Sequence, residues 1–99
     1  MRVISKKPLR EFWRKHSDAE QPLQEWHKRT LKADWDNLPD VRKDFSHADL
    51  VGICTVFNIG GNKYRLIAKI NFQRQIVFVR FVLTHKEYDK GGWNNDCGC

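Results

Sequence analysis

His85 is the titratable side chain in this 99-residue sequence whose setting is best suited to chemistry. It follows a long apolar run and lies three residues before Tyr88. An imidazole can accept or release a proton near neutral pH. If residues 84–89 turn helically, Tyr88 lies on the side of His85. The pair could therefore take part in proton transfer to and from a substrate.

A row of cations precedes this segment. Arg65 and Lys69 are four residues apart in a stretch with a period of two, so a strand would place both on one face, roughly 13 Å apart. Lys63 would share that face. Such a row matches a run of phosphates, although a solvated sheet face explains it equally well.

Arg80 interrupts the apolar run of residues 76–83. An unpaired, buried arginine in a central strand costs several kcal/mol, so it must meet a carboxylate or face a polar cavity. Because Arg65 and Lys69 are expected on the neighbouring strand, we expect an anion site. A buried pair with an acidic residue of the helices is the alternative.

Cleavage of RNA needs a base for the 2′-hydroxyl, an acid for the leaving 5′-oxygen and cations for the charge that develops on phosphorus. These roles can be filled without a metal by five catalytic candidates: His85, Arg80, Lys69, Arg65 and Tyr88. The residues predicted to bind RNA around them are Lys63, Arg74 and Lys86. The sequence has no HExxH or CxxC motif, so we predict no metal site and no cofactor.

The hydrophobic period changes near residue 50, which separates helices from strands. Before it, helical spacing predicts a helix capped by Ser5, a second opened by a capping box at residues 17–20, and a short third after Asn37. After it, alternation predicts strands at 52–59, 63–72 and 76–83, joined by tight turns. Residues 3–4 could add a short strand. We predict an α+β fold in which N-terminal helices pack on a small antiparallel sheet.

The composition indicates one domain spanning residues 1–99, with an irregular tail at 91–99. The net charge is +6, and residues 50–99 carry 7 Lys and Arg against only 3 Asp and Glu. An uncompensated basic surface favours a polyanionic partner such as nucleic acid. No apolar stretch is long enough to span a membrane, and the basic N-terminus lacks the apolar run of a secretory signal. We therefore expect a cytoplasmic protein.

The three cysteines are an odd number, which is atypical of a disulfide framework. Cys54 lies in an apolar run and is expected to be a small buried hydrophobe. Cys97 and Cys99 are expected to lie in a reduced, frayed tail, because a zinc site would need further ligands.

Two motifs carry a resemblance to a known family. Residues 57–66 (FNIGGNKYRL) and 79–89 (VRFVLTHKEYD), with the start at residues 2–5 (RVIS), resemble the HigB-type toxins of bacterial type II toxin–antitoxin modules, members of the RelE superfamily. The resemblance implies helices on a small antiparallel sheet and a metal-independent endoribonuclease that cleaves mRNA on the ribosome. It implies attack of the 2′-hydroxyl on the adjacent phosphate, and a HigA-type antitoxin that neutralises the toxin and represses the operon with it. The family's basic and histidine positions map onto Arg65, Lys69, Arg80, His85 and, more loosely, Tyr88.

Two other classes remain open. A non-catalytic RNA-binding module would use the same basic sheet but needs exposed aromatic side chains for base stacking. Tyr64, Phe72 and Phe78 fit either that role or the core. A DNA-binding regulator is less consistent, because the helices lack a recognition pattern and the basic excess lies on the strands.

Overall fold

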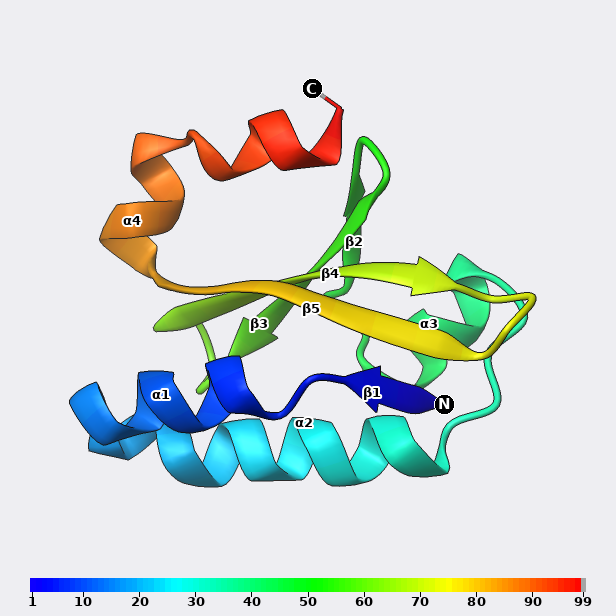
Figure 1. Cartoon of the computed structure of the whole chain (residues 1–99), viewed down its shortest axis with the longest axis horizontal. Helices are drawn as coiled ribbons and strands as arrows, with labels where there is room; N and C mark the ends of the chain where they lie inside the picture. Colours follow the sequence, from blue (N-terminus) through cyan, green and yellow to red (C-terminus); the bar gives the residue numbers. More distant parts are fainter. Residues whose placement is uncertain (99) are drawn as a thin grey trace.

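A five-stranded sheet lies between two groups of helices in the computed structural model, which describes residues 1–98 (Figure 1). The strands are β1 (Arg2–Ile4), β2 (Asp49–Val51), β3 (Cys54–Ile59), β4 (Tyr64–Asn71) and β5 (Ile76–Thr84). The helices are α1 (Lys7–Lys15), α2 (Glu20–Lys32), α3 (Leu38–Asp44) and α4 (His85–Lys90), with 3₁₀ turns η1 (Ser17–Ala19) and η2 (Trp93–Cys97). In this described part of the chain, no helix is long and apolar enough to cross a membrane.

The sheet is mixed, with the order β1-β5-β4-β3-β2. The pairs from β2 to β5 are antiparallel, as the short turns predict. The prediction of a wholly antiparallel sheet is wrong at the other edge, because β1 pairs with β5 in parallel. No hairpin joins these two strands, so turn geometry does not fix their relative direction.

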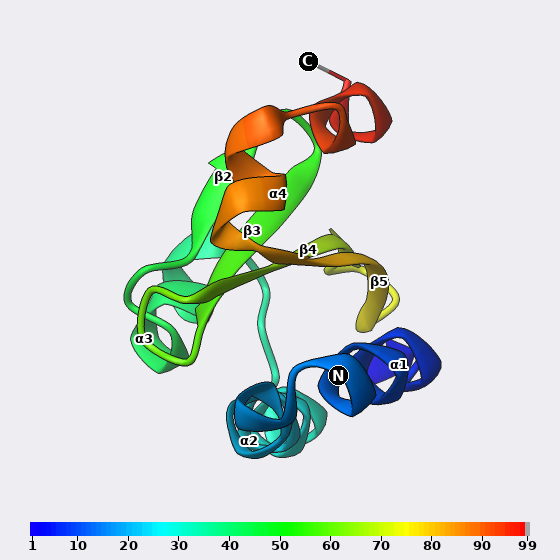
Figure 2. The same ribbon diagram turned by 90° about the vertical axis from the view of Figure 1, so that its left-hand side faces the viewer.

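Helices α1 and α2 cover one face of the sheet and bury the main core against it (Figure 2). Leu9, Leu23 and Trp26 from the helical layer belong to the same cluster as Leu66 and Val77 from the strands, and each is at most 1% exposed. Full burial of one such side chain contributes about 1.5–3 kcal/mol. This layer buries one face of the sheet and leaves the opposite face to the C-terminal elements.

One of the three predicted helix caps is confirmed. Asn37 caps α3 through its side chain. Ser5 does not cap α1, whose N-cap is Lys6 without a side-chain hydrogen bond. Ser17–Ala19 forms η1 instead of a capping box, and α2 begins only after it. Asp18 within this turn accepts hydrogen bonds from Lys63 and Tyr64 of the hairpin between β3 and β4.

The C-terminal segment is ordered and covalently attached to the sheet, which corrects two predictions. Residues 93–97 form η2 rather than an irregular tail, and Cys97 forms a disulfide with Cys54, 43 residues earlier. Cys54 is therefore not a free buried thiol. The two cysteines meet because both belong to a second cluster on the face away from α1 and α2, together with Val56 and Ile67. Cys99 lies outside the described residues.

Candidate nucleic-acid interface

Strand β4 separates its basic side chains from the main core by simple alternation. Tyr64, Leu66 and Ala68 belong to the main core, whereas Ile67 belongs to the second cluster on the opposite face. Arg65 and Lys69, two residues either side of Ile67, therefore share that opposite face. We call it the basic face.

A β-bulge in β5 determines the direction of the Arg80 side chain. The register skips this residue, because Ile67 pairs with Phe81 and Ala68 pairs with Val79. An extra residue in one strand re-aims the neighbouring side chains. Arg80 is consequently exposed, so the burial cost inferred from the apolar run does not arise.

Arg80 and Lys69 converge on one carboxylate, that of Asp96 in η2. The Nε and Nη2 atoms of Arg80 donate to Asp96 at 2.7 and 3.1 Å, and Nζ of Lys69 lies 3.5 Å from Oδ2. The hydrogen bond from Arg80 lowers the pKa of Asp96, and the same bond raises the pKa of Arg80. Arg80 therefore meets a carboxylate of the C-terminal segment, which is neither the open anion site that we expected nor a buried pair with an acidic residue of the N-terminal helices.

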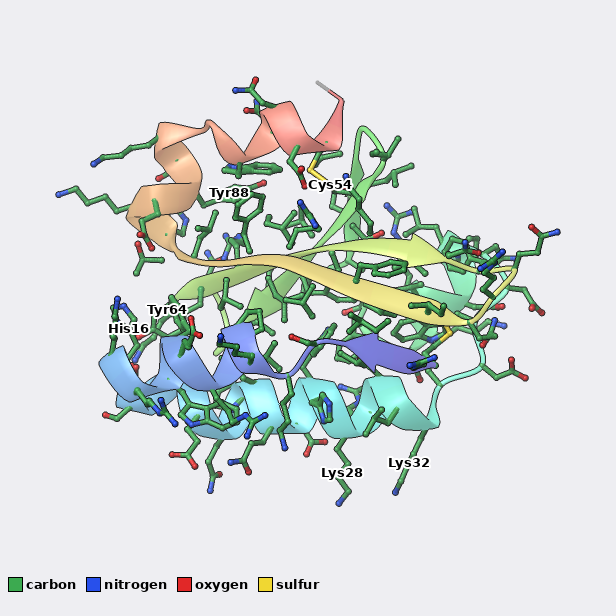
Figure 3. All side chains as sticks on the ribbon, viewed as in Figure 1. His16, Lys28, Lys32, Cys54, Tyr64 and Tyr88 are labelled. Carbon is green, nitrogen blue, oxygen red and sulfur yellow. A yellow bond between two sulfur atoms is a disulfide. The ribbon has the colours of Figure 1, made fainter. Side chains whose placement is uncertain are left out.

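Arg65 on β4 contacts α4 through the side chain of Tyr88. The residue is 8% exposed, and its guanidinium donates to the carbonyl oxygens of Asn62 and Tyr64. It also lies 5.3 Å from the centre of the Tyr88 ring. Tyr88 points from α4 towards the sheet and stacks on Trp93 at 4.8 Å (Figure 3). Arg65 and Tyr88 are thus adjacent, and their contact fixes the position of α4.

His85 is the first residue of α4 and its ring is about half exposed. Its Nδ1 lies 3.0 Å from Oδ2 of Asp89, one helical turn later. A carboxylate on Nδ1 fixes the orientation of an imidazole and leaves Nε2 available to another partner. The helix starts at this point because Thr84 and Glu87 form a reciprocal capping box.

The three predicted RNA-binding residues lie in different places. Lys63 pairs with Asp18 at 3.1 Å and so turns towards the helical layer. Arg74 is exposed in the turn between β4 and β5, and Lys86 is exposed next to His85. Lys86 follows His85 in the sequence, and the backbone carbonyl of Lys63 accepts a 3.1 Å hydrogen bond from the His85 amide, although the Lys63 side chain points elsewhere.

The catalytic candidates therefore form two groups along β5. Lys69 and Arg80 meet at Asp96, whereas Arg65 and Tyr88 contact each other near the end of β5, where α4 begins with His85. Arg80 and His85 are five residues apart, which corresponds to roughly 16 Å of strand. The two groups therefore lie at separate points along β5.

An open cleft of about 310 Å³ runs beside Arg80, between α1, β5 and α4. Its polar wall includes Lys15, His16 and Glu87. His16 lies at the end of α1 near Tyr64 and stacks on Phe12 at 4.5 Å (Figure 3). No local sequence pattern predicts this cleft, because its walls come from residues 8–16 and 80–87, which are far apart in the sequence.

Asp96 is the residue of this interface that the sequence analysis missed. It lies in a short segment that the odd cysteine count predicted to be unattached, whereas the disulfide at Cys97 and the hydrogen bond from the Ile53 amide to the Cys97 carbonyl hold it on the sheet. Within residues 1–98, no three His, Cys, Asp or Glu side chains gather as metal ligands.

The fold and the basic face together define a small α+β protein in which two cations of the sheet pair with one carboxylate. Residues 19–91 match the HigB toxin family, which is described as the RelE-like toxic component of a toxin–antitoxin system. The chain belongs to this family, so the resemblance found in its two motifs is confirmed.

Named relatives agree with this assignment. The mRNA interferase HigB of Escherichia coli O6:H1 is 32% identical over 93 residues, which are 91% of this chain and 90% of the relative. The mRNA interferase toxin HigB of Escherichia coli K12 and the mRNA interferase HigB of Shigella flexneri are each 53% identical over 34 residues, 34% of this chain and 33% of the relative. The family match ends at residue 91, so η2 lies beyond it.

Proposed function

We propose that this toxin is a cytoplasmic endoribonuclease that cleaves mRNA on the ribosome without a metal and is neutralised by a HigA-type antitoxin. The observation that carries the proposal is the convergence of Lys69 and Arg80 on a single carboxylate, on the sheet face where α4 presents His85. Two cations that hold a carboxylate can hold a phosphate, because both anions offer oxygen pairs to an arginine fork. The names of the relatives, mRNA interferases, support RNA as the source of that phosphate.

The reaction that fits these residues is an internal transesterification. The 2′-oxygen forms a bond to the adjacent phosphorus, and the bond from phosphorus to the 5′-oxygen breaks. One proton leaves the 2′-hydroxyl and one reaches the 5′-oxygen. We assign one of these transfers to His85, whose ring Asp89 orients, and the binding of flanking phosphates to Lys69 and Arg80.

The non-catalytic RNA-binding module is less well supported. Of the three aromatic residues that could stack on bases, Tyr64 is buried in the main core and Phe72 packs against that core. Phe78, 36% exposed, is the remaining one of the three. A stacking platform needs several accessible rings.

Induction of the chain in a bacterial host tests the proposal. We expect growth arrest, new mRNA 5′ ends that appear only in translated regions, and relief by co-expression of a neighbouring helix-turn-helix gene. Arrest without new 5′ ends would contradict the nuclease and favour the binding module. New ends in untranslated RNA would contradict the dependence on the ribosome.

A further inference from the structure

The C-terminal segment, residues 91–98, lies across the basic face. Figures 1 and 2 show α4 and η2 over the side of the sheet opposite α1 and α2. Gly91 and Gly92 both have positive φ, at 77° and 86°, and turn the chain back after α4. The carbonyl of Cys97 then accepts a hydrogen bond of 2.9 Å from the backbone of Ile53. The segment is thus fastened to the hairpin of β2 and β3.

Asp96 occupies the place that an RNA phosphate would need. Its two oxygens accept both bonds of the Arg80 fork, and Lys69 approaches the same oxygen as Nε of Arg80. A carboxylate and a phosphate cannot occupy this fork together. The side chain of Asp96 is only 28% exposed, so the site is substantially closed to an outside anion.

We propose that Asp96 is an internal competitor for RNA phosphate and that the Cys54–Cys97 disulfide is a redox-controlled latch that keeps it in place. The inference rests on the proposed function, in which Lys69 and Arg80 bind RNA phosphate. A small dithiol opens the latch by thiol–disulfide exchange. Its two thiols become one disulfide, and Cys54 and Cys97 each gain one electron and one proton.

The disulfide is what makes the competitor effective. Asp96 is adjacent to Cys97, so the bond to β3 holds its carboxylate at the site at a high effective concentration. Without that bond, the segment that follows the two glycines is held by the Ile53–Cys97 hydrogen bond and by the contacts of Trp93 and Asp96, and a segment with few buried contacts opens locally at low cost. Both cysteines are buried, so the dithiol gains access when η2 opens locally.

Two further observations favour regulation over a purely structural role. The segment that carries Asp96 and Cys97 lies beyond residue 91, where the match to the family model ends. Disulfides in the reducing cytoplasm, where we place the protein, are usually transient or redox-sensing.

The test measures the dissociation constant of a fluorescein-labelled single-stranded RNA by anisotropy, over a range of salt concentrations. The oxidised wild type, the wild type with dithiothreitol, and oxidised Asp96→Asn are compared. We expect Asp96→Asn to bind at least tenfold more tightly than the oxidised wild type, and the reduced wild type to approach it. Lys69 and Arg80 both become available to RNA phosphates. The slope of the logarithm of RNA affinity against the logarithm of salt concentration should therefore become steeper by about 1.4.

Cys99→Ser is the matched control, since it removes a thiol but neither half of the disulfide, and it should respond to dithiothreitol as the wild type does. Equal RNA affinity of oxidised wild type and Asp96→Asn would overturn the competition. An unchanged affinity on reduction would overturn the latch.

A second readout separates this proposal from the nuclease assignment. Hydrogen exchange at the Ile53 amide reports release of Cys97 without any RNA, and its protection should fall on reduction. Protection that persists would overturn the latch even if RNA cleavage is observed. A competition that holds for RNA binding, together with no cleavage by Asp96→Asn during translation, would instead overturn the nuclease and leave the competitor in place.

Discussion

At the scale of the residue, most of the chemical interpretation depends on Arg80 and its carboxylate partner, Asp96. The bulge in β5 presents the guanidinium on the basic face, and Asp96 and Lys69 complete a compact charged group there. Such a group can serve structure or ligand binding. Because all three side chains are partly exposed, their attraction is screened by water and contributes little to stability. We therefore assign Arg80 to binding rather than to folding.

Replacement of Arg80 by methionine tests this assignment. We expect the melting temperature to change little and the RNA affinity of the reduced protein to fall about tenfold or more, because a charge-assisted contact to phosphate is lost. Lys28→Met is the matched control, since Lys28 on α2 points away from the sheet (Figure 3). An unchanged affinity with a higher melting temperature would show that Arg80 is a structural residue.

At the scale of the element, the capping box of α4 positions His85. Oγ1 of Thr84 accepts the Glu87 amide at 3.2 Å, and the Glu87 carboxylate accepts the Thr84 amide at 2.9 Å. The amide of Thr84 lowers the pKa of Glu87, so this carboxylate stays ionised and keeps the cap closed. A helix this short depends on such a cap for its first turn.

Thr84→Ala should therefore destabilise α4 by about 1 kcal/mol and slow mRNA cleavage more than it weakens RNA binding. Thr84→Ser retains the hydroxyl and should restore both. Cleavage rates and RNA affinities of the two variants, measured side by side, check this. Equal rates for Thr84→Ala and the wild type would show that the cap does not position His85.

The C-terminal segment is the second element whose energetics can be measured. The disulfide closes a loop between residues 43 positions apart, which in the chain-entropy account stabilises the protein by about 4 kcal/mol. Urea unfolding with and without dithiothreitol should show a loss of that order, and Cys99→Ser should show the same loss. Coincident unfolding curves would mean that Cys54 and Cys97 are not joined in solution.

At the scale of the whole molecule, the sequence predicts those features of the fold that depend on local patterns of residues. The change of period near residue 50 separates the helices from the three long strands correctly, and the alternation in β4 assigns Arg65 and Lys69 to one face. Contacts between distant segments could not be predicted. The parallel pairing of β1, the link between Cys54 and Cys97, and the approach of Asp96 to Arg80 all depend on tertiary packing that no local period encodes.

In the molecule as a whole, the two faces of the sheet have different roles. Helices α1 and α2 bury the main core on one face, whereas the other carries the basic residues under α4 and η2 (Figure 2). The net charge of +6 favours a polyanionic partner, which is consistent with the proposed binding of RNA. The proposed cleavage of mRNA depends most on His85 as a proton-transfer group.

Cleavage of a single mRNA in a reconstituted translation reaction, with the reduced protein, tests that claim most directly. General acid–base catalysis contributes about 10²–10⁴ in rate, so His85→Gln should slow cleavage at least about a hundredfold. His47→Gln, the same change at an exposed histidine between α3 and β2, should cleave at the wild-type rate. A His85→Gln variant that cleaves as fast as His47→Gln would contradict the account.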